Sequence, residues 1–411
     1  MKNNLFIGLF IILFEVSFGI KFNIIGTMSP REIFLLGYSF ILLSQRHLKL
    51  YKTYPLLRKI TWLYLGLLIS QIVSEIAVGN AFYNASRGIM VTVMSYLHLL
   101  FLFSYFIKDR KYILFALAGI VLRLLIFGTE KEGSVEEVLS GEAAGFIKFY
   151  LLHLVTLPLL IASVLLLRKR KIAIVIVAAG LLLIILGARN GGATLALSGI
   201  ITYLVLIGKT FKTRQVILTL SVTAILGYGL YAIYVNQVLI GKITSGNSEQ
   251  ILLLKNPYNP INLIFAGRTE ILIGWQAFMD EPLFGHGSWT QDVTGKYRTL
   301  MASFRKDIPV VIAGSGRVIP SHSVLIGTGM YNGIFAFLFM FAILFFFIKT
   351  GFKTIDKKDP YIMTVIYSIL FIIWNGMFSP VPHFRYTLPL YFAIILTSYC
   401  VIKSKNKPKI T

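Results

Sequence analysis

Runs of apolar residues, each about as long as one membrane-spanning helix, take up most of this chain. A helix that crosses a bilayer needs about 20 consecutive, mostly apolar residues. Twelve segments of the 411-residue sequence come close to this description, so the pattern predicts an all-α integral membrane protein with about 12 transmembrane helices. The segments are 5–25, 30–45, 60–79, 88–107, 111–128, 146–167, 171–187, 191–208, 215–238, 324–348, 361–378 and 385–402.

One long segment, 241–323, is too polar for a bilayer to accept. It divides the chain into 1–240, with nine predicted helices, and 324–411, with three more helices and a tail. Within this large loop, Thr269–Met279 has the apolar spacing of an amphipathic helix, and Pro282 ends that pattern. The sequence shows no internal repeat and no second soluble domain.

The composition agrees with a membrane protein. Hydrophobic residues make up 56% of the chain, charged residues 14%, and the mean hydropathy is +0.76, which excludes an ordinary water-soluble domain. The net charge of +23 does not indicate nucleic-acid binding, because most cations lie in short clusters between apolar runs. The single cysteine, Cys400, excludes a disulfide framework within the chain.

The positions of the basic clusters predict the topology. Lysine and arginine favour short cytoplasmic loops, and an N-terminus in the cytoplasm places more than half of the 40 cations on that side. Both termini are then cytoplasmic and the large loop is periplasmic. The weakest apolar segment, 30–45, is retained as a span because the basic stretch 46–59 would otherwise lie outside. The first segment resembles a signal peptide, but Ile20-Lys21 is a poor cleavage site, so we expect an uncleaved span.

Several ionisable residues fall inside the predicted spans, where they are costly unless paired or functional. Glu15, Glu75, Arg123 and Lys148 fit either helix-to-helix pairing or a role in substrate binding. Among the histidines, His98 and His153 are expected to be packing residues, and His383 could face the site but is expected to be a loop residue. No histidine motif indicates a catalytic metal, so no metal or cofactor is predicted.

Three positions next to the membrane surface are candidates for chemistry. Arg189 stands in a very short glycine-rich turn, where it could anchor to lipid phosphates or bind the phosphate of a lipid carrier. Arg268 begins the amphipathic helix of the large loop. His322 lies where the loop re-enters the membrane, as a loop residue before the next helix or as a base.

These residues occur in an order that resembles the O-antigen polymerase and O-antigen ligase superfamily of bacterial polysaccharide assembly. The order is Arg189 in a short turn, then the series Arg268, Trp275, Pro282, Gly285 and Gly287 in a large loop, and then His322-Ser323, followed after nine residues by Gly333. The resemblance covers about 187–336. The sequence departs from the usual pattern at Ala336 and in reading Ala-Arg-Asn at the short turn.

The resemblance implies a GT-C-like multi-span glycosyltransferase in the bacterial inner membrane. Its reaction would transfer a glycan from an undecaprenyl-pyrophosphate carrier to an acceptor hydroxyl, without metal or nucleotide. Partners would be the lipid-linked oligosaccharide, membrane lipid and other polysaccharide-assembly proteins such as a chain-length regulator, and no nucleic acid. His322 would be the catalytic base, and the pyrophosphate would be bound by Arg189 and Arg268, with Arg317 and Arg385 as secondary candidates.

Two enzyme roles and one transport role stay open at the level of sequence. A polymerase would add the growing chain to the next lipid-linked repeat unit, and we rank it first because the Lys-, Ile- and Phe-rich composition fits variable polysaccharide gene clusters. A ligase would transfer the glycan to lipid A core, and one dominant outer loop suits it. A lipid-glycan flippase would need no large loop. Tyr258, Trp275, Trp289 and Tyr297 could stack on sugars or simply pack.

Overall fold

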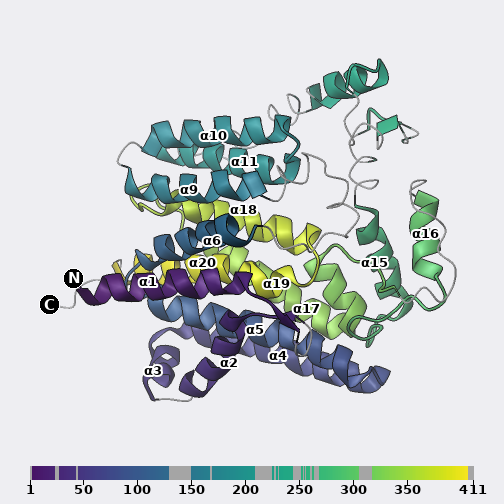
Figure 1. Cartoon of the computed structure of the whole chain (residues 1–411), viewed down its shortest axis with the longest axis horizontal. Helices are drawn as coiled ribbons and strands as arrows, with labels where there is room; N and C mark the ends of the chain where they lie inside the picture. Colours follow the sequence, from purple (N-terminus) through teal and green to yellow (C-terminus); the bar gives the residue numbers. More distant parts are fainter. Residues whose placement is uncertain are drawn as a thin grey trace.

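The structure is a computed structural model, and over the part of the chain that it describes the protein is mostly helical (Figure 1). The described residues are 2–23, 27–42, 45–128, 150–166, 169–208, 225, 228–229, 231–243, 251–252, 254, 256–259, 262, 268–304 and 317–405. The all-α fold class is therefore confirmed. Lys148 and most of the predicted span 215–238 lie outside these residues.

The helices follow the apolar pattern closely. The first half contains α1 (Lys2–Val16), α2 (Pro30–Leu42), α3 (Gln45–Thr53), α4 (Pro55–Val78), α5 (Phe82–Phe106), α6 (Tyr112–Phe127), α9 (Leu152–Leu165), α10 (Lys169–Ile185) and α11 (Arg189–Leu206). The second half contains α15 (Thr269–Asp280), α16 (Lys296–Phe304), α17 (Val324–Phe352), α18 (Ile362–Phe378), α19 (His383–Tyr386) and α20 (Leu388–Lys405).

Three of the described helices, α4, α5 and α17, are long and apolar enough to span a membrane. Shorter apolar helices cover Asn4–Gly19, Tyr112–Phe127, Leu152–Leu165, Ile362–Phe378 and Leu388–Ser404. The predicted span 30–45 corresponds to α2, whose 13 residues rise only about 20 Å, less than the thickness of a bilayer core. The structure thus supports a helical bundle with membrane-spanning helices and stops short of twelve spans.

The predicted first span is the clearest difference at a helix end. Instead of continuing to residue 25, α1 ends at Val16 and is followed by a 3-10 turn, η1 (Ser17–Gly19). Two short antiparallel strands come next, β1 (Phe22–Asn23) and β2 (Thr27–Met28), with Phe22 opposite Met28. This hairpin turns the chain back into α2.

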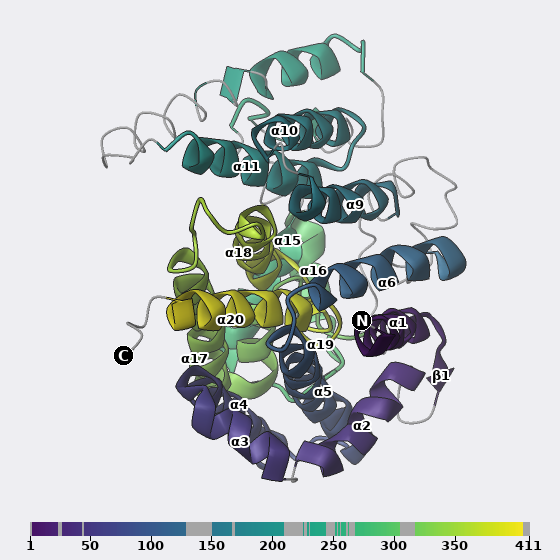
Figure 2. The same cartoon turned by 90° about the vertical axis from the view of Figure 1, so that its left-hand side faces the viewer.

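Most helices of the bundle run side by side, and the bundle has two distinct ends (Figure 1). Both termini lie at one end, which we call the terminal end, and α15 and α16 lie at the other, which we call the loop end. Seen from the terminal end, α5 and α20 are near the middle, and α10 and α11 form a pair at the periphery (Figure 2).

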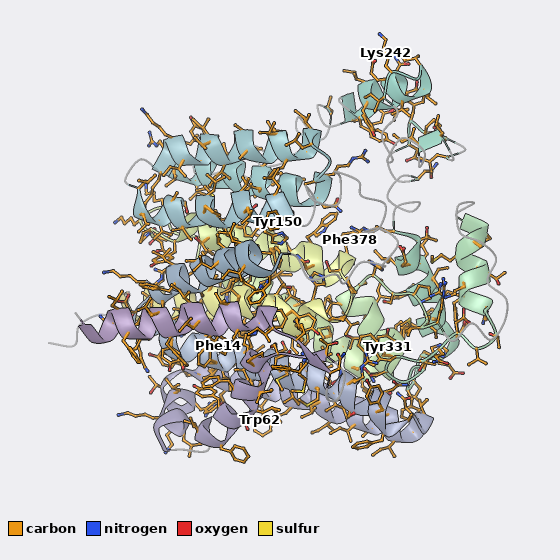
Figure 3. The ribbon with its side chains drawn as sticks, in the orientation of Figure 1. Phe14, Trp62, Tyr150, Lys242, Tyr331 and Phe378 are labelled. Carbon is orange, nitrogen blue, oxygen red and sulfur yellow. The ribbon has the colours of Figure 1, made fainter. Side chains whose placement is uncertain are left out.

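Burial separates inner helices from outer ones. In the most apolar stretch of α5, 72% of the residues are buried, against 33% in α4 and 39% in α17. Large apolar side chains such as Trp62 and Ile185 are instead exposed on the outside of the bundle, and Figure 3 shows Trp62 at its edge. An apolar outer face is the arrangement expected of helices in contact with lipid.

At the terminal end, Arg110 connects three segments of the chain. Arg110 donates to both carboxylate oxygens of Asp359, each at 2.8 Å, and to the Ser398 hydroxyl at 3.1 Å. Its guanidinium also lies 4.1 Å from the centre of the Tyr361 ring. These contacts fasten the segment between α5 and α6 to the segment between α17 and α18 and to α20.

Glycines bring α10 and α11 into close contact. A Cβ added at Gly180 would lie 2.5 Å from the backbone nitrogen of Ala196 and 2.7 Å from the carbonyl oxygen of Gly192. Small residues allow helix backbones in membranes to approach this closely and to gain packing energy. The interface fixes the start of α11, and Arg189 is the first residue of that helix.

We predict that Gly180→Ala destabilises the bundle, because the new methyl group collides with backbone atoms that cannot rotate away. The expected cost is about 1–3 kcal/mol, measured as a lower midpoint of thermal unfolding in detergent. Gly37→Ala is the matched control, since nothing lies within 4 Å of a Cβ at Gly37 in α2. Equal midpoints for the two variants would contradict the close α10–α11 packing.

Candidate functional site

A break in α17 holds the segment Pro282–Gly287 of the large loop. Gly333 has φ 75° and ψ −171° inside α17, so the regular helical hydrogen bonds are interrupted there. The freed groups are satisfied by the loop. The backbone N–H of His286 donates to the Met330 carbonyl at 2.9 Å, Gly287 donates to Tyr331 at 2.8 Å, and Ile334 donates to the Pro282 carbonyl at 2.8 Å.

Two glycines make this approach possible. A Cβ on Gly333 would lie 2.0 Å from the carbonyl oxygen of Leu283, and a Cβ on Gly285 would lie 2.6 Å from the backbone of Tyr331. Both glycines also have positive φ, which other residues adopt only at a cost. The two glycine-containing parts of the motif, distant in sequence, are therefore in direct backbone contact.

Glu75, near the end of α4, forms hydrogen bonds to the same loop. Its Oε1 accepts hydrogen bonds from the Ser288 backbone N–H at 3.0 Å and from the Asn332 amide at 3.1 Å, and its Oε2 accepts from Asn80 at 2.6 Å. Asn80 also donates to the Ser288 carbonyl at 2.9 Å. Glu75 is 4% exposed, so this carboxylate is a buried junction between α4, α17 and the loop.

The loop residues beyond this junction form a small unit of their own. Ile273, Ala277 and Phe278 of α15 pack with Tyr297 and Met301 of α16 and with the first turns of α17. At the edge of the unit, burial by itself would raise the pKa of Asp280, but hydrogen bonds from Lys296, Tyr297 and Gln276 hold it below its ordinary value. The Nε2 atom of His286 lies 2.8 Å from the Ala277 carbonyl near the end of α15. His286 therefore serves the packing of the loop.

His322 lies directly before α17 at the loop end. The next residue, Ser323, caps the helix by accepting from the Ile326 N–H at 3.1 Å, and its hydroxyl donates to the Gly376 carbonyl of α18 at 3.3 Å. A short antiparallel bridge between Gln291 and Val318 supports the approach to His322. The side chain of His322 is half-buried. The bridge at Val318 fixes the chain before His322, and the capped helix α17 fixes the chain after it.

Two further histidines lie within electrostatic range of one another at this point. Burial, and to a lesser extent the nearby imidazoles of His153 and His322, lower the pKa of His383, in α19, to about 4. His153 belongs to the first turn of α9. His383 therefore stays neutral near pH 7. Three imidazoles, on α9, on α19 and just before α17, thus lie near one another although they are distant in sequence. The sequence had indicated packing and loop roles for His153 and His383.

The four arginines proposed as anion ligands have different surroundings. Arg189 donates to the Tyr234 hydroxyl at 2.6 Å from the start of α11. Arg268 occupies the position before the first residue of α15. Arg317 is exposed, five residues before His322, and it lies near enough to Arg298 to lower the pKa of that arginine further, after burial as the larger cause.

Arg385 of α19 is engaged in a buried polar network. Its guanidinium is paired with Glu32 at the start of α2, and it donates to the Thr27 carbonyl at 3.2 Å. Next to this pair, Glu15 contacts Arg31 at 2.9 Å and the Nε2 atom of His98 at 3.1 Å. The pairing interpretation of Glu15 is therefore confirmed. The charge of Arg385 is partly neutralised, and its main visible contact holds α19 against α2.

Taken together, the loop end combines a half-buried imidazole, a neutral imidazole beside it and cations on four different elements. This set can take up a proton and can stabilise an anionic leaving group. Among the described residues, no group of three or more His, Cys, Asp or Glu side chains is arranged to hold a metal ion. The side chains named above are suited to acid–base and electrostatic chemistry.

We predict that Glu75→Gln loosens the segment 285–289. All three partners of Glu75 are N–H donors, and an amide side chain offers one oxygen in place of two, so at least one buried donor loses its acceptor. Hydrogen exchange of the backbone in 285–289 should then be faster. Glu281→Gln, an exposed change in the same loop, is the control and should leave the exchange unchanged. Unaltered protection in Glu75→Gln would refute the anchoring role.

Comparison with known proteins assigns no family to this chain. No protein-family model matches it, and no curated protein matches it. A function therefore has to be argued from the residues at the loop end and from their contacts.

Proposed function

We propose that the protein is a membrane glycosyltransferase that transfers a polyprenyl-pyrophosphate-linked glycan to an acceptor hydroxyl, with the loop end as its active site. The observation that carries the proposal is the contact between the two halves of the motif region. Pro282–Gly287 is hydrogen-bonded to α17 at the break around Gly333, and His322 stands at the beginning of the same helix. The part of the motif from Pro282 to Gly287 and the part from His322 to Gly333 thus meet in one local structure.

The reaction follows from the groups at this site. The acceptor hydroxyl attacks the anomeric carbon of the donor sugar, a new C–O bond forms, and the bond between that carbon and the pyrophosphate oxygen breaks. His322 takes the proton of the hydroxyl, and the polyprenyl pyrophosphate leaves with the electron pair. His383 lies beside His322 and is neutral near pH 7, so it places no positive charge against the base before the reaction.

Cations stabilise the charge that develops on the leaving group. Arg268, before α15, and Arg189, before the glycine-packed α11, are the proposed pyrophosphate ligands. Both stand at the N-terminal end of a helix, where backbone N–H groups also favour negative charge. Arg317 is a further candidate because it is exposed and close to His322 in sequence.

In this proposal the loop end faces the periplasm and the terminal end faces the cytoplasm of a bacterial inner membrane. The basic residues Arg110 and Lys169, which meet at Asp359 on the terminal end, fit a cytoplasmic side. We place polymerisation of lipid-linked repeat units first. Transfer to lipid A core remains the alternative, and the single large loop favours it.

Deletion of the gene in its host separates the two roles. A polymerase defect should leave lipopolysaccharide core with one repeat unit, seen on a gel. A ligase defect should leave bare core together with accumulated lipid-linked glycan. Normal lipopolysaccharide in the deletion strain would contradict both enzyme roles.

We predict that His322→Ala lowers glycan transfer by about 100-fold or more, the usual contribution of a general base, while the protein stays in the membrane at its normal level. Arg268→Ala should also abolish transfer, because the leaving group loses a cation. The readout is complementation of the deletion strain together with the amount of tagged protein. Arg58→Ala is the control, since this exposed arginine begins α4, near the terminal end. Full transfer by His322→Ala would overturn the site.

We predict that Arg385 acts by positioning α19, so that reversing its ion pair restores function. Glu32→Arg and Arg385→Glu should each lower transfer strongly, because each leaves a buried like-charge pair. The double variant recreates the attraction in the opposite direction and should recover a large part of the activity. An inactive double variant that folds normally would show that Arg385 binds the pyrophosphate directly.

A further inference from the structure

A stack of aromatic and cationic side chains lies at the loop end, outside the groups used so far. The guanidinium carbon of Arg87 is 4.3 Å from the centre of the Trp289 ring and 5.4 Å from the centre of the Tyr83 ring. Tyr83 and Arg87 are four residues apart on α5 and so share one face of the helix. On the inner side, the ring centres of Trp289 and Tyr331 are 6.3 Å apart. Figure 3 shows Tyr331 where α17 meets the loop.

Trp289 has a strained backbone that its surroundings maintain. Its φ is 59°, the only positive value at a non-glycine residue among the described residues, and this conformation costs about 1–2 kcal/mol for an L-residue. The neighbours on both sides are fixed. The Ser288 N–H donates to Glu75, and the Thr290 carbonyl accepts from Ile319 at 3.0 Å. Strain that is held in place this way is characteristic of positions where a side chain is presented to a ligand.

Arg87 lies within cation–π range of two aromatic rings. Rings lie against the guanidinium, and no described carboxylate forms an ion pair with it. Glu75, which lies close to the neighbouring Gly88, is already occupied by three donors. The in-plane N–H groups of a guanidinium match the two oxygens of a carboxylate. Arg87 is therefore a candidate for binding the carboxylate of a ligand.

The stack is connected to the proposed catalytic region. Thr290 follows Trp289 directly, and its carbonyl is hydrogen-bonded to Ile319, three residues before His322. The bridge between Gln291 and Val318 continues the same pairing. A short two-stranded connection thus leads from Trp289 to the approach of His322, and an extended glycan could contact both.

We propose that Tyr83, Arg87 and Trp289 form a subsite for an acidic sugar unit of the glycan, a sugar ring that carries a carboxylate. Tyr83 is 51% exposed and provides the outer ring of the stack, against which the weakly positive C–H face of a sugar can pack. The carboxylate takes N–H groups from the edge of Arg87. The role of this sugar as part of the acceptor or the donor of a transfer reaction rests on the proposed function. The binding of the sugar at the subsite does not depend on that function.

The test measures binding of monosaccharides to the full-length protein in phosphatidylcholine nanodiscs by saturation-transfer NMR. Glucuronic acid is the acidic probe and glucose the neutral one. The wild type should bind glucuronic acid about tenfold more tightly than glucose, as a charge-assisted bidentate contact provides. Arg87→Gln should reduce glucuronic acid to the level of glucose, and Arg87→Lys should fall between, because it keeps the charge and loses the fork.

Two further variants separate stacking from folding. Tyr83→Phe keeps the ring and should bind as the wild type, whereas Tyr83→Ala should lose both sugars. Tyr83 is largely exposed, so neither change should disturb the bundle. Arg58→Gln, at a distant exposed arginine, should have no effect. Equal binding of the two sugars, or unchanged binding in Arg87→Gln, would overturn the proposal. Displacement of glucuronic acid by equimolar inorganic phosphate would also overturn it, since the site would then be a general anion site.

This inference can fail separately from the proposed function. His322→Ala should bind glucuronic acid as the wild type does, because His322 is outside the stack. If transfer depends on His322 while Arg87→Gln leaves sugar binding unchanged, the subsite is wrong and the enzyme assignment stands. If His322→Ala retains full transfer while Arg87→Gln loses acidic-sugar binding, the catalytic site is wrong and the subsite stands.

Discussion

The loop end depends on the exchange of backbone hydrogen bonds between the broken α17 and Pro282–Gly287. A helix in a membrane cannot be interrupted without partners for the N–H and C=O groups that the break releases. At Gly333 those partners come from the Pro282–Gly287 segment of the large loop. The helix break therefore depends on the docked loop, and the docked loop depends on the break. The same contacts fix the position of α17, which begins just after His322.

The buried carboxylate of Glu75 is explained by the same constraint. The loop turns sharply at Gly285 and Gly287, and the N–H of the next residue, Ser288, is bound by Glu75 rather than by a backbone carbonyl. A carboxylate accepts several such donors at once, and its negative charge strengthens each bond. Glu75 therefore compensates for the irregular backbone that the docking requires, and the strained Trp289 follows immediately after the N–H that it binds. Rigidity of the loop and presentation of the aromatic stack have one origin.

The sequence could predict the helices but not their contacts. The predicted span 60–79 corresponds to α4 (Pro55–Val78), and 324–348 corresponds to α17. Both could be predicted because the length of the apolar run is enough to identify such a helix. The apolar pattern overran the end of α1, since a hairpin rich in apolar residues follows it. Glu75 could not be assigned from sequence, because its partners Ser288 and Asn332 lie 213 and 257 residues away. Arg87 was missed for the same reason, whereas the order of His322, Arg268 and the glycines was visible in the sequence, and His383 was open to a position facing the site.

The neutral state of His383 bears on how a base at His322 would work. Two imidazoles within electrostatic range and half removed from water resist carrying positive charge together. His383 is uncharged near pH 7, so it does not repel a proton that His322 takes up in the proposed reaction. Positive charge on His322 in turn makes protonation of His383 still less favourable. In the proposed reaction, attraction between the His322 imidazolium and the departing pyrophosphate would favour the transfer when the charge on the leaving group is greatest.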